Sequence, residues 1–334
     1  MNHFQRYLVE EFAEDYQEGH LSRREALKMI AAITGSMLLA SSILAGCTPV
    51  DQPASQPSPG STQLPPATQG SLTEPTETPA EQPTASAGET ASPVEQPQEA
   101  EDIQFAGEGA TLMGYLARPS GDGPFPVVLV CHENRGLTEH IKDVTRRLAN
   151  AGYVALAVDL LSRQGGTSAL SSDEVPGVLG NTPPEQFVQD FLSGWRYLQE
   201  QPSAQADRVG MVGFCFGGGV TWLMATRMPE LRAAVPFYGP HPPIEEVPNI
   251  QAPVLAIYAE RDQRINQGIP AIEEAMQQNN KVYEKVIYPD ADHAFHNDTG
   301  SRYNPEAARD AWERTLSWFE RYLNQTASKS TPTI

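Results

Sequence analysis

One short segment of the chain has the residue types and the order of a nucleophile turn. It reads Gly213-Phe214-Cys215-Phe216-Gly217-Gly218-Gly219, after an apolar run and before a stretch with helical spacing. A sharp strand-to-helix turn brings neighbouring backbone close together, which favours glycine around the reactive residue. The turn would expose the Cys215 sulfur at a helix N-terminus, where the helix dipole favours a thiolate. A lone cysteine is otherwise typical of an unreactive buried side chain, so the interpretation depends on partners.

Two later segments supply such partners in the chain order nucleophile, acid, histidine. The expected strand 253–259 leads into Asp262, and the expected strand 283–288 leads into the loop that holds His293. Taken singly, each is also typical of an ordinary loop residue. Because all three follow strand ends, a parallel sheet would bring them to one edge. We therefore expect a triad in which Asp262 orients the His293 imidazole toward Cys215.

The elements that must position these residues are predicted by the hydrophobic pattern from about residue 103 onward. Strands are expected at 111–118, 127–133, 153–160, 209–214, 233–238, 253–259 and 283–288, of which 127–133 and 153–160 have the continuous apolar run of a buried strand, and helices at 138–150, 184–201, 217–228, 268–279 and 305–323. Strands that alternate with helices indicate the α/β class, with a mostly parallel central sheet and helices on both faces. We expect one catalytic domain over 103–325 and a flexible tail over 326–334.

The N-terminus has the pattern of an export signal. Arg23 and Arg24 precede an uncharged run over 29–46, which ends in Leu44-Ala45-Gly46-Cys47. Paired arginines are typical of a twin-arginine signal, and the last four residues resemble a bacterial lipobox with Cys47 as the lipidated residue. An uncleaved membrane helix is the alternative, although the run is rich in small residues. We expect 1–47 to be a signal peptide, and the mature protein to be lipid-anchored on the outer face of the bacterial cytoplasmic membrane, periplasmic or extracellular.

Composition limits the remaining possibilities. Residues 48–102 are rich in Pro, Ser, Thr and Glu, with nine acidic residues and no Lys or Arg from Asp51 to Asp102, which predicts a disordered linker. A net charge of -19 argues against nucleic acid as a partner. The histidines His132, His140 and His241 are too scattered to predict a metal site. We expect no cofactor, no membrane contact besides the lipid anchor, and a monomer.

The region from about 103 to 323 resembles the dienelactone hydrolases (carboxymethylenebutenolidases), cysteine members of the α/β-hydrolase fold. The matching features are the GFCFGG turn, Asp262 after its strand, Asp292-His293-Ala294-Phe295, and His132-Glu133-Asn134-Arg135-Gly136. The resemblance implies a hydrolase that cleaves an ester or lactone through a thioester intermediate.

The resemblance also implies roles for residues outside the triad. Glu133 would contact the resting cysteine and move when substrate binds, and the backbone N–H groups of Phe216 and Asn134 would form the oxyanion hole. Arg163 matches one of two family arginines that hold a substrate carboxylate, whereas Asn297 stands in place of the other. An anionic or polar ester or lactone is therefore the expected substrate.

Two other functions fit the same sequence. One is a broad-specificity carboxylesterase or thioesterase that uses the same three residues. The other is a non-catalytic surface lipoprotein that uses the hydrolase fold for binding, against which the complete set of triad residues argues.

Overall fold

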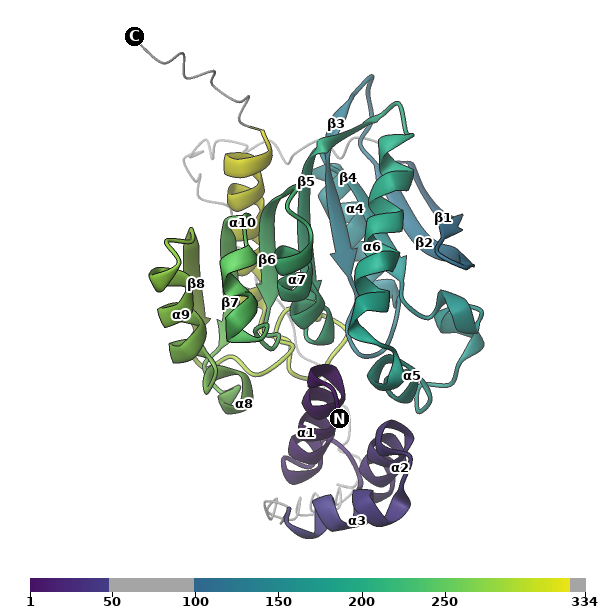
Figure 1. Ribbon diagram of the computed structural model, residues 1–334, viewed down its shortest axis with the longest axis vertical. Coiled ribbons are helices and arrows are strands. Elements are labelled where there is room, and N and C mark those ends of the chain that lie inside the picture. Colours follow the sequence, from purple (N-terminus) through teal and green to yellow (C-terminus); the bar gives the residue numbers. More distant parts are fainter. Residues whose placement is uncertain (48–98, 325–334) are drawn as a thin grey trace, which may run out of the picture. The chain divides into compact units, whose positions relative to one another are not determined.

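An eight-stranded mixed sheet lies at the centre of the protein, seen in a computed structural model that describes residues 1–47 and 99–324 (Figure 1). The strands are β1 (Glu99–Gly107), β2 (Ala110–Arg118), β3 (Phe125–Cys131), β4 (Val154–Asp159), β5 (Ala204–Phe214), β6 (Leu231–Phe237), β7 (Val254–Ala259) and β8 (Tyr283–Tyr288). Their order across the sheet is β1-β2-β4-β3-β5-β6-β7-β8. The pairs β1–β2 and β2–β4 are antiparallel and the others are parallel. The expected mostly parallel sheet is confirmed.

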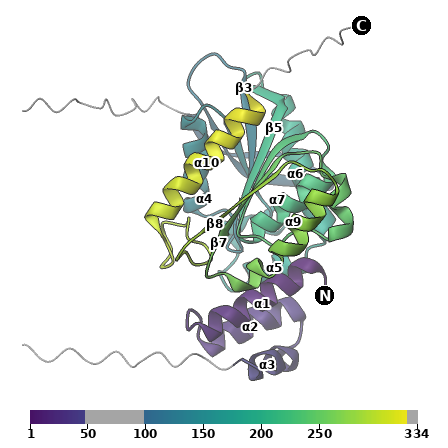
Figure 2. The same ribbon diagram turned by 90° about the vertical axis from the view of Figure 1, so that its left-hand side faces the viewer.

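Helices cover both faces of this sheet (Figure 2). On one side lie α4 (Glu139–Asn150) and α10 (Pro305–Leu323), and on the other α6 (Pro184–Gln199), α7 (Phe216–Arg227) and α9 (Ile269–Gln278). The connections hold α5 (Val175–Asn181), α8 (Gln263–Asn266) and the 3-10 turns Ser162–Gln164, Thr167–Ala169 and Ile244–Asn249. Because both faces are covered, every residue of β4 and β7 is buried, which explains their unbroken apolar sequences.

The first strand begins earlier than the sequence predicts. Residues 99–102 fall in the expected linker, but β1 starts at Glu99 and pairs with β2 along its whole length. An edge strand tolerates acidic side chains that point into solvent, and here Glu101 pairs with Arg118 at 2.8 Å and Asp102 with Lys142 at 2.7 Å. The rest of the predicted linker, 48–98, and the predicted tail lie outside the described residues.

Three N-terminal helices belong to the same compact unit as the sheet. They are α1 (His3–Gln17), α2 (Arg23–Thr34) and α3 (Met37–Ala45). Helix α1 contacts α5 and α7, and α2 contacts α5. The apolar side chains of Phe4, Leu8, Phe12 and Ile30 are fully or almost fully buried. Within the part of the chain that the structure describes, no helix has both the length and the apolar character needed to cross a membrane.

Candidate active site

Cys215 lies in a strained turn between β5 and α7. Its φ of 57° and ψ of -119° are unusual for a residue with a side chain, and such strain is most often found at functional sites. Glycine is required on both sides of it. A Cβ on Gly213 would lie 2.2 Å from the carbonyl oxygen of Gly217, and one on Gly217 would lie 2.5 Å from that of Cys131. The predicted nucleophile turn is therefore present in the backbone.

Asp262 and His293 meet beside this turn. Asp262 follows β7 and caps α8 by accepting a hydrogen bond from the Ile265 amide at 3.2 Å. Its other oxygen, Oδ2, lies 2.5 Å from Nδ1 of His293, which comes from the loop after β8. The Cys215 sulfur lies within 4.8 Å of a His293 ring nitrogen. The three sequence-predicted residues thus gather at one edge of the sheet, each no more than 6% exposed.

The charges at this site depend on burial and on mutual contacts. Burial alone would lower the pKa of His293, but the Asp262 carboxylate and Cys215 outweigh it and hold that pKa well above its ordinary value. Burial would raise the pKa of Asp262, whereas attraction to His293 lowers it. Burial and the Glu11 carboxylate raise the pKa of the Cys215 thiol, against the opposing effect of His293. The imidazole is the group here that favours a thiolate.

The N-terminal helix α1 reaches into this site, which the sequence did not predict. The Tyr7 hydroxyl and the Glu11 carboxylate each lie 3.3 Å from the Cys215 sulfur. Glu11 also accepts a hydrogen bond from the Asn134 side chain at 2.9 Å. Phe4, Leu8 and Phe12 recur every four positions, a spacing from which a helix with one buried face could have been predicted. It gave no indication of which surface that face covers.

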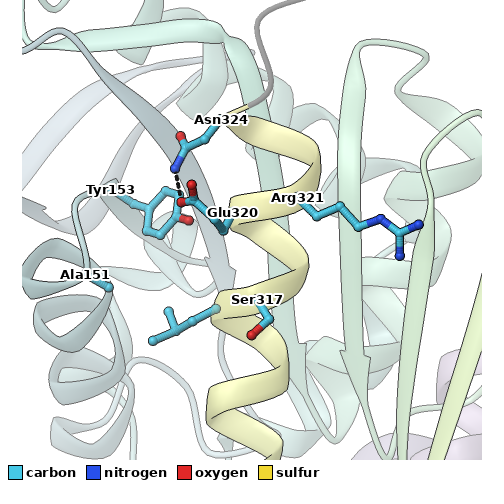
Figure 3. Close-up of a pocket in the computed structure, with 7 residues that line it drawn as sticks. Ala151, Tyr153, Ser317, Glu320, Arg321 and Asn324 are labelled. Atoms are coloured by element: carbon cyan, nitrogen blue, oxygen red, sulfur yellow. Dashed lines mark hydrogen bonds between the residues drawn. The ribbon is translucent and has the colours of Figure 1, made fainter.

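A small cavity of about 180 Å³ opens beside the sulfur. Cys215, His293 and charged side chains from several elements form its wall, namely Glu11, Asp15, Glu133, Arg135 and Arg302. A larger hollow of about 660 Å³ lies between α10 and the turn before β4, lined by Tyr153, Ser317, Glu320, Arg321 and Asn324 among others (Figure 3). That hollow is at the amino end of β4, whereas Cys215 follows the carboxyl end of β5, so we assign the chemistry to the smaller cavity.

Comparison with known proteins places the chain in a family. The model of the Dienelactone hydrolase family matches residues 112–323. The chain belongs to the dienelactone hydrolase family. It is 37% identical over 236 residues to a Methylorubrum extorquens protein named "Putative carboxymethylenebutenolidase", which covers 67% of this chain and 81% of that protein.

Solved structures agree with this assignment. The crystal structure of "Putative Dienelactone Hydrolase" from Klebsiella pneumoniae is 33% identical, with a TM-score of 0.64, and the match covers 68% of this chain and all of that one. A Pyrococcus horikoshii acylaminoacyl peptidase shares the fold alone, at 17% identity and a TM-score of 0.56, over 69% of this chain and 42% of that one. Family membership makes the chain a dienelactone hydrolase-like hydrolase, and the family's substrates are small-molecule esters or lactones.

Two residues that the dienelactone hydrolase resemblance singled out are engaged elsewhere. Glu133 accepts a hydrogen bond from the Asn297 side chain at 2.7 Å and makes none with Cys215. The expected contact with the resting cysteine is made instead by Glu11, because α1 fills that side of the sulfur. Arg163 does not line the cavity, since its guanidinium pairs with the buried carboxylate of Asp190 at 2.6 Å.

The two amides predicted for the oxyanion hole have no hydrogen-bond acceptor among the described residues. Phe216 is the first residue of α7, so its N–H is one of the free donors at a helix N-terminus. Asn134 lies in the loop after β3, and its backbone N–H donates to no group among the described residues. Asn134 also lines the cavity beside the sulfur.

Proposed function

We propose that the chain hydrolyses an ester or lactone through a thioester on Cys215. The observation that carries this proposal is the hydrogen bond of Asp262 to Nδ1 of His293, beside a cysteine in a strained strand-to-helix turn. With Nδ1 held by the carboxylate, Nε2 is the nitrogen left to exchange a proton with the sulfur. A buried free cysteine that served only packing would need neither the strain nor the imidazole.

The proposed mechanism has two stages. The Cys215 thiolate attacks the carbonyl carbon, and the backbone N–H groups of Phe216 and Asn134 hold the developing oxyanion. His293 protonates the leaving oxygen as the carbon–oxygen bond breaks, which leaves an acyl group on sulfur. His293 then takes a proton from water, whose oxygen attacks the thioester and releases the acid. Each oxyanion donor would lower the activation free energy by about 3 kcal/mol.

The wall of the cavity favours a polar substrate. Arg135 and Arg302 are the cationic side chains in its wall, and they support an anionic group on the ester or lactone. A broad carboxylesterase or thioesterase would use the same acyl chemistry, and no contact in the site favours it over a lactonase.

Trapping the acyl group tests this function. We expect that brief incubation of the Glu14→Arg/Asp15→Arg variant, in which the ion pairs that hold α1 beside the sulfur are lost, with 4-nitrophenyl acetate, followed by an acid quench, leaves one acetyl group on the peptide that contains Cys215. Cys131 is fully buried and should stay unmodified in the same digest, which provides an internal control. Turnover of the ester with the acetyl group on another residue, or without any acyl-enzyme on Cys215 under a rapid quench, would contradict the mechanism.

We further propose that residues 1–47 are an export signal ending at a lipidated Cys47. Arg23 and Arg24 are exposed at the start of α2, next to the Ser22–Glu25 capping box. Exposed guanidinium groups are accessible to an export receptor. We expect a mature protein in the bacterial membrane fraction whose first residue is an acylated Cys47, measured by mass spectrometry of the N-terminal peptide. Arg23→Lys/Arg24→Lys should leave the full chain in the cytoplasm, whereas Lys28→Arg should not. A mature protein that begins at Met1 would refute the proposal.

A further inference from the structure

Two side chains of α1 contact the Cys215 sulfur. They are the Tyr7 hydroxyl and the Oε1 atom of Glu11, each at 3.3 Å. The same Glu11 oxygen lies 2.9 Å from Nδ2 of Asn134 and 3.7 Å from Nε2 of His293. A single carboxylate oxygen therefore contacts the proposed nucleophile and lies beside the proposed base.

This oxygen occupies the place that a substrate needs. A carbonyl carbon must approach to about 3–3.5 Å from the attacking atom for reaction. Glu11 Oε1 lies 3.3 Å from the sulfur and also beside Asn134 and Nε2 of His293, so it fills the space in which a substrate carbonyl would meet the nucleophile and the base. The acid released by hydrolysis of an ester is also a carboxylate. Glu11 thus lies where the product acid would lie before it leaves.

Specific contacts along α1 hold this carboxylate in position. Glu14 pairs with Arg264 at 2.8 Å, and Asp15 pairs with Arg302 at 2.9 Å. The Arg264 guanidinium also lies over the Tyr7 ring, 4.6 Å from its centre. The Phe4 ring packs at 5.0 Å from that of Phe216, next to the nucleophile. The partners of α1 are therefore residues of the hydrolase domain itself.

Burial of the Glu11 carboxylate beside the sulfur is locally unfavourable in free energy. Its second oxygen, Oε2, is buried and has no hydrogen-bond partner among the described residues. A buried carboxylate oxygen without a partner is unfavourable, and a residue chosen for packing alone would avoid it. The apolar contacts and the two ion pairs offset this cost while α1 is attached. Favourable contacts along α1, opposed by this unfavourable burial, are what we expect of a helix that blocks the site reversibly.

We propose that α1 is an intramolecular inhibitor, which keeps the site closed while residues 1–47 are attached and opens it when they leave. This inference rests on the proposed function, because α1 inhibits an enzyme only if Cys215 is the nucleophile. It also gives the export signal a second task, because cleavage before Cys47 would remove α1 together with Tyr7 and Glu11. The enzyme would then be inactive where it is synthesised and active after export.

The test releases α1 in the full chain in two ways and measures access to the sulfur. One is the double substitution Glu14→Arg/Asp15→Arg, which replaces both ion pairs with repulsion. The other is a protease recognition sequence inserted between residues 60 and 70. After cleavage of this sequence the protein is diluted, so that the high local concentration of the tethered helix is lost. The readouts are the rate of iodoacetamide alkylation at the Cys215 peptide, by mass spectrometry, and the hydrolysis of 4-nitrophenyl acetate.

We expect the rate of alkylation at Cys215 to rise at least about tenfold in both released forms, because the rate follows the fraction of molecules in which the site is open. Glu10→Arg is the matched control, because Glu10 is exposed on α1 and makes no ion pair among the described residues. It should alkylate like the unmodified chain. Circular dichroism and thermal unfolding establish that the released forms remain folded.

The outcomes separate the two proposals. Unchanged alkylation in both released forms, or hydrolysis that falls when α1 is released, would overturn the inhibitory role. Faster alkylation together with faster hydrolysis supports both proposals. Faster alkylation without hydrolysis of any ester or lactone would support the blocked site and contradict the proposed function.

Discussion

Replacing Cys215 with alanine is expected to lower kcat/KM for an activated ester by about 10⁴-fold or more, because only binding and the oxyanion donors would remain. The measurement is best made in the Glu14→Arg/Asp15→Arg background, in which α1 is expected to be released. Cys215→Ser should also lose most activity, since a hydroxyl is a much weaker nucleophile than a thiolate when placed in a site built for sulfur.

The matched control for this prediction is the other cysteine of the hydrolase domain. Cys131 ends β3, is fully buried and has a pKa raised by burial and by Cys215, so it has the properties of an inert core thiol. Cys131→Ala should change kcat/KM less than threefold and lower the free energy of unfolding by about 1 kcal/mol. If Cys215→Ala kept a tenth or more of the activity while remaining folded, the nucleophile would have to be sought elsewhere.

Asp262→Asn should be the next most damaging change, with a loss of about 10³- to 10⁴-fold in kcat. An asparagine can donate to Nδ1 of His293 and so favour the tautomer with the wrong nitrogen protonated. Asp290→Asn is the matched control, because Asp290 precedes His293 in the same loop and is exposed, and within the described part of the chain its side chain pairs only with Arg261, at 2.9 Å. It should change kcat less than twofold. Equal losses in the two variants would indicate damage to the loop rather than a role for Asp262.

The same substitution has a pH-dependent effect on stability. Because attraction to His293 outweighs burial and lowers the pKa of Asp262, its carboxylate stabilises the fold above its unfolded pKa of about 4. That contribution is lost as pH falls through the lower pKa of the folded state. Urea unfolding at pH 7 should therefore show Asp262→Asn to be less stable than the unmodified chain, and the difference should shrink in acid.

The meeting of Cys215, Asp262 and His293 could be predicted because it depends on local rules. Glycines around Cys215 indicate a crowded turn, and the residues that follow strand ends in a parallel sheet meet at one edge. The antiparallel edge was less predictable. Residues 99–102 have the acidic composition of the segment before them, and only pairing with β2 determines that they form a strand.

Contacts between residues that are far apart in the sequence could not be predicted from it. Glu11 and Cys215 are 204 positions apart, so no spacing rule relates them. The apolar spacing in α1 could have indicated a buried face, but the surface that this face covers is formed by residues from distant parts of the hydrolase domain. Arg163 is a similar case. Its family position suggested a substrate contact, whereas the side chain of Asp190 on α6 lies close enough to pair with it.

The departure of α1 would also make the electrostatic potential in the cavity more positive. With α1 docked, the wall carries three carboxylates, from Glu11, Asp15 and Glu133, against the two guanidinium groups of Arg135 and Arg302. Without α1, one carboxylate faces two guanidinium groups, and Arg302 loses its partner Asp15. Anions would then be drawn toward the sulfur by a field that weakens with added salt, so the rate at which charged substrates are captured should fall as ionic strength rises.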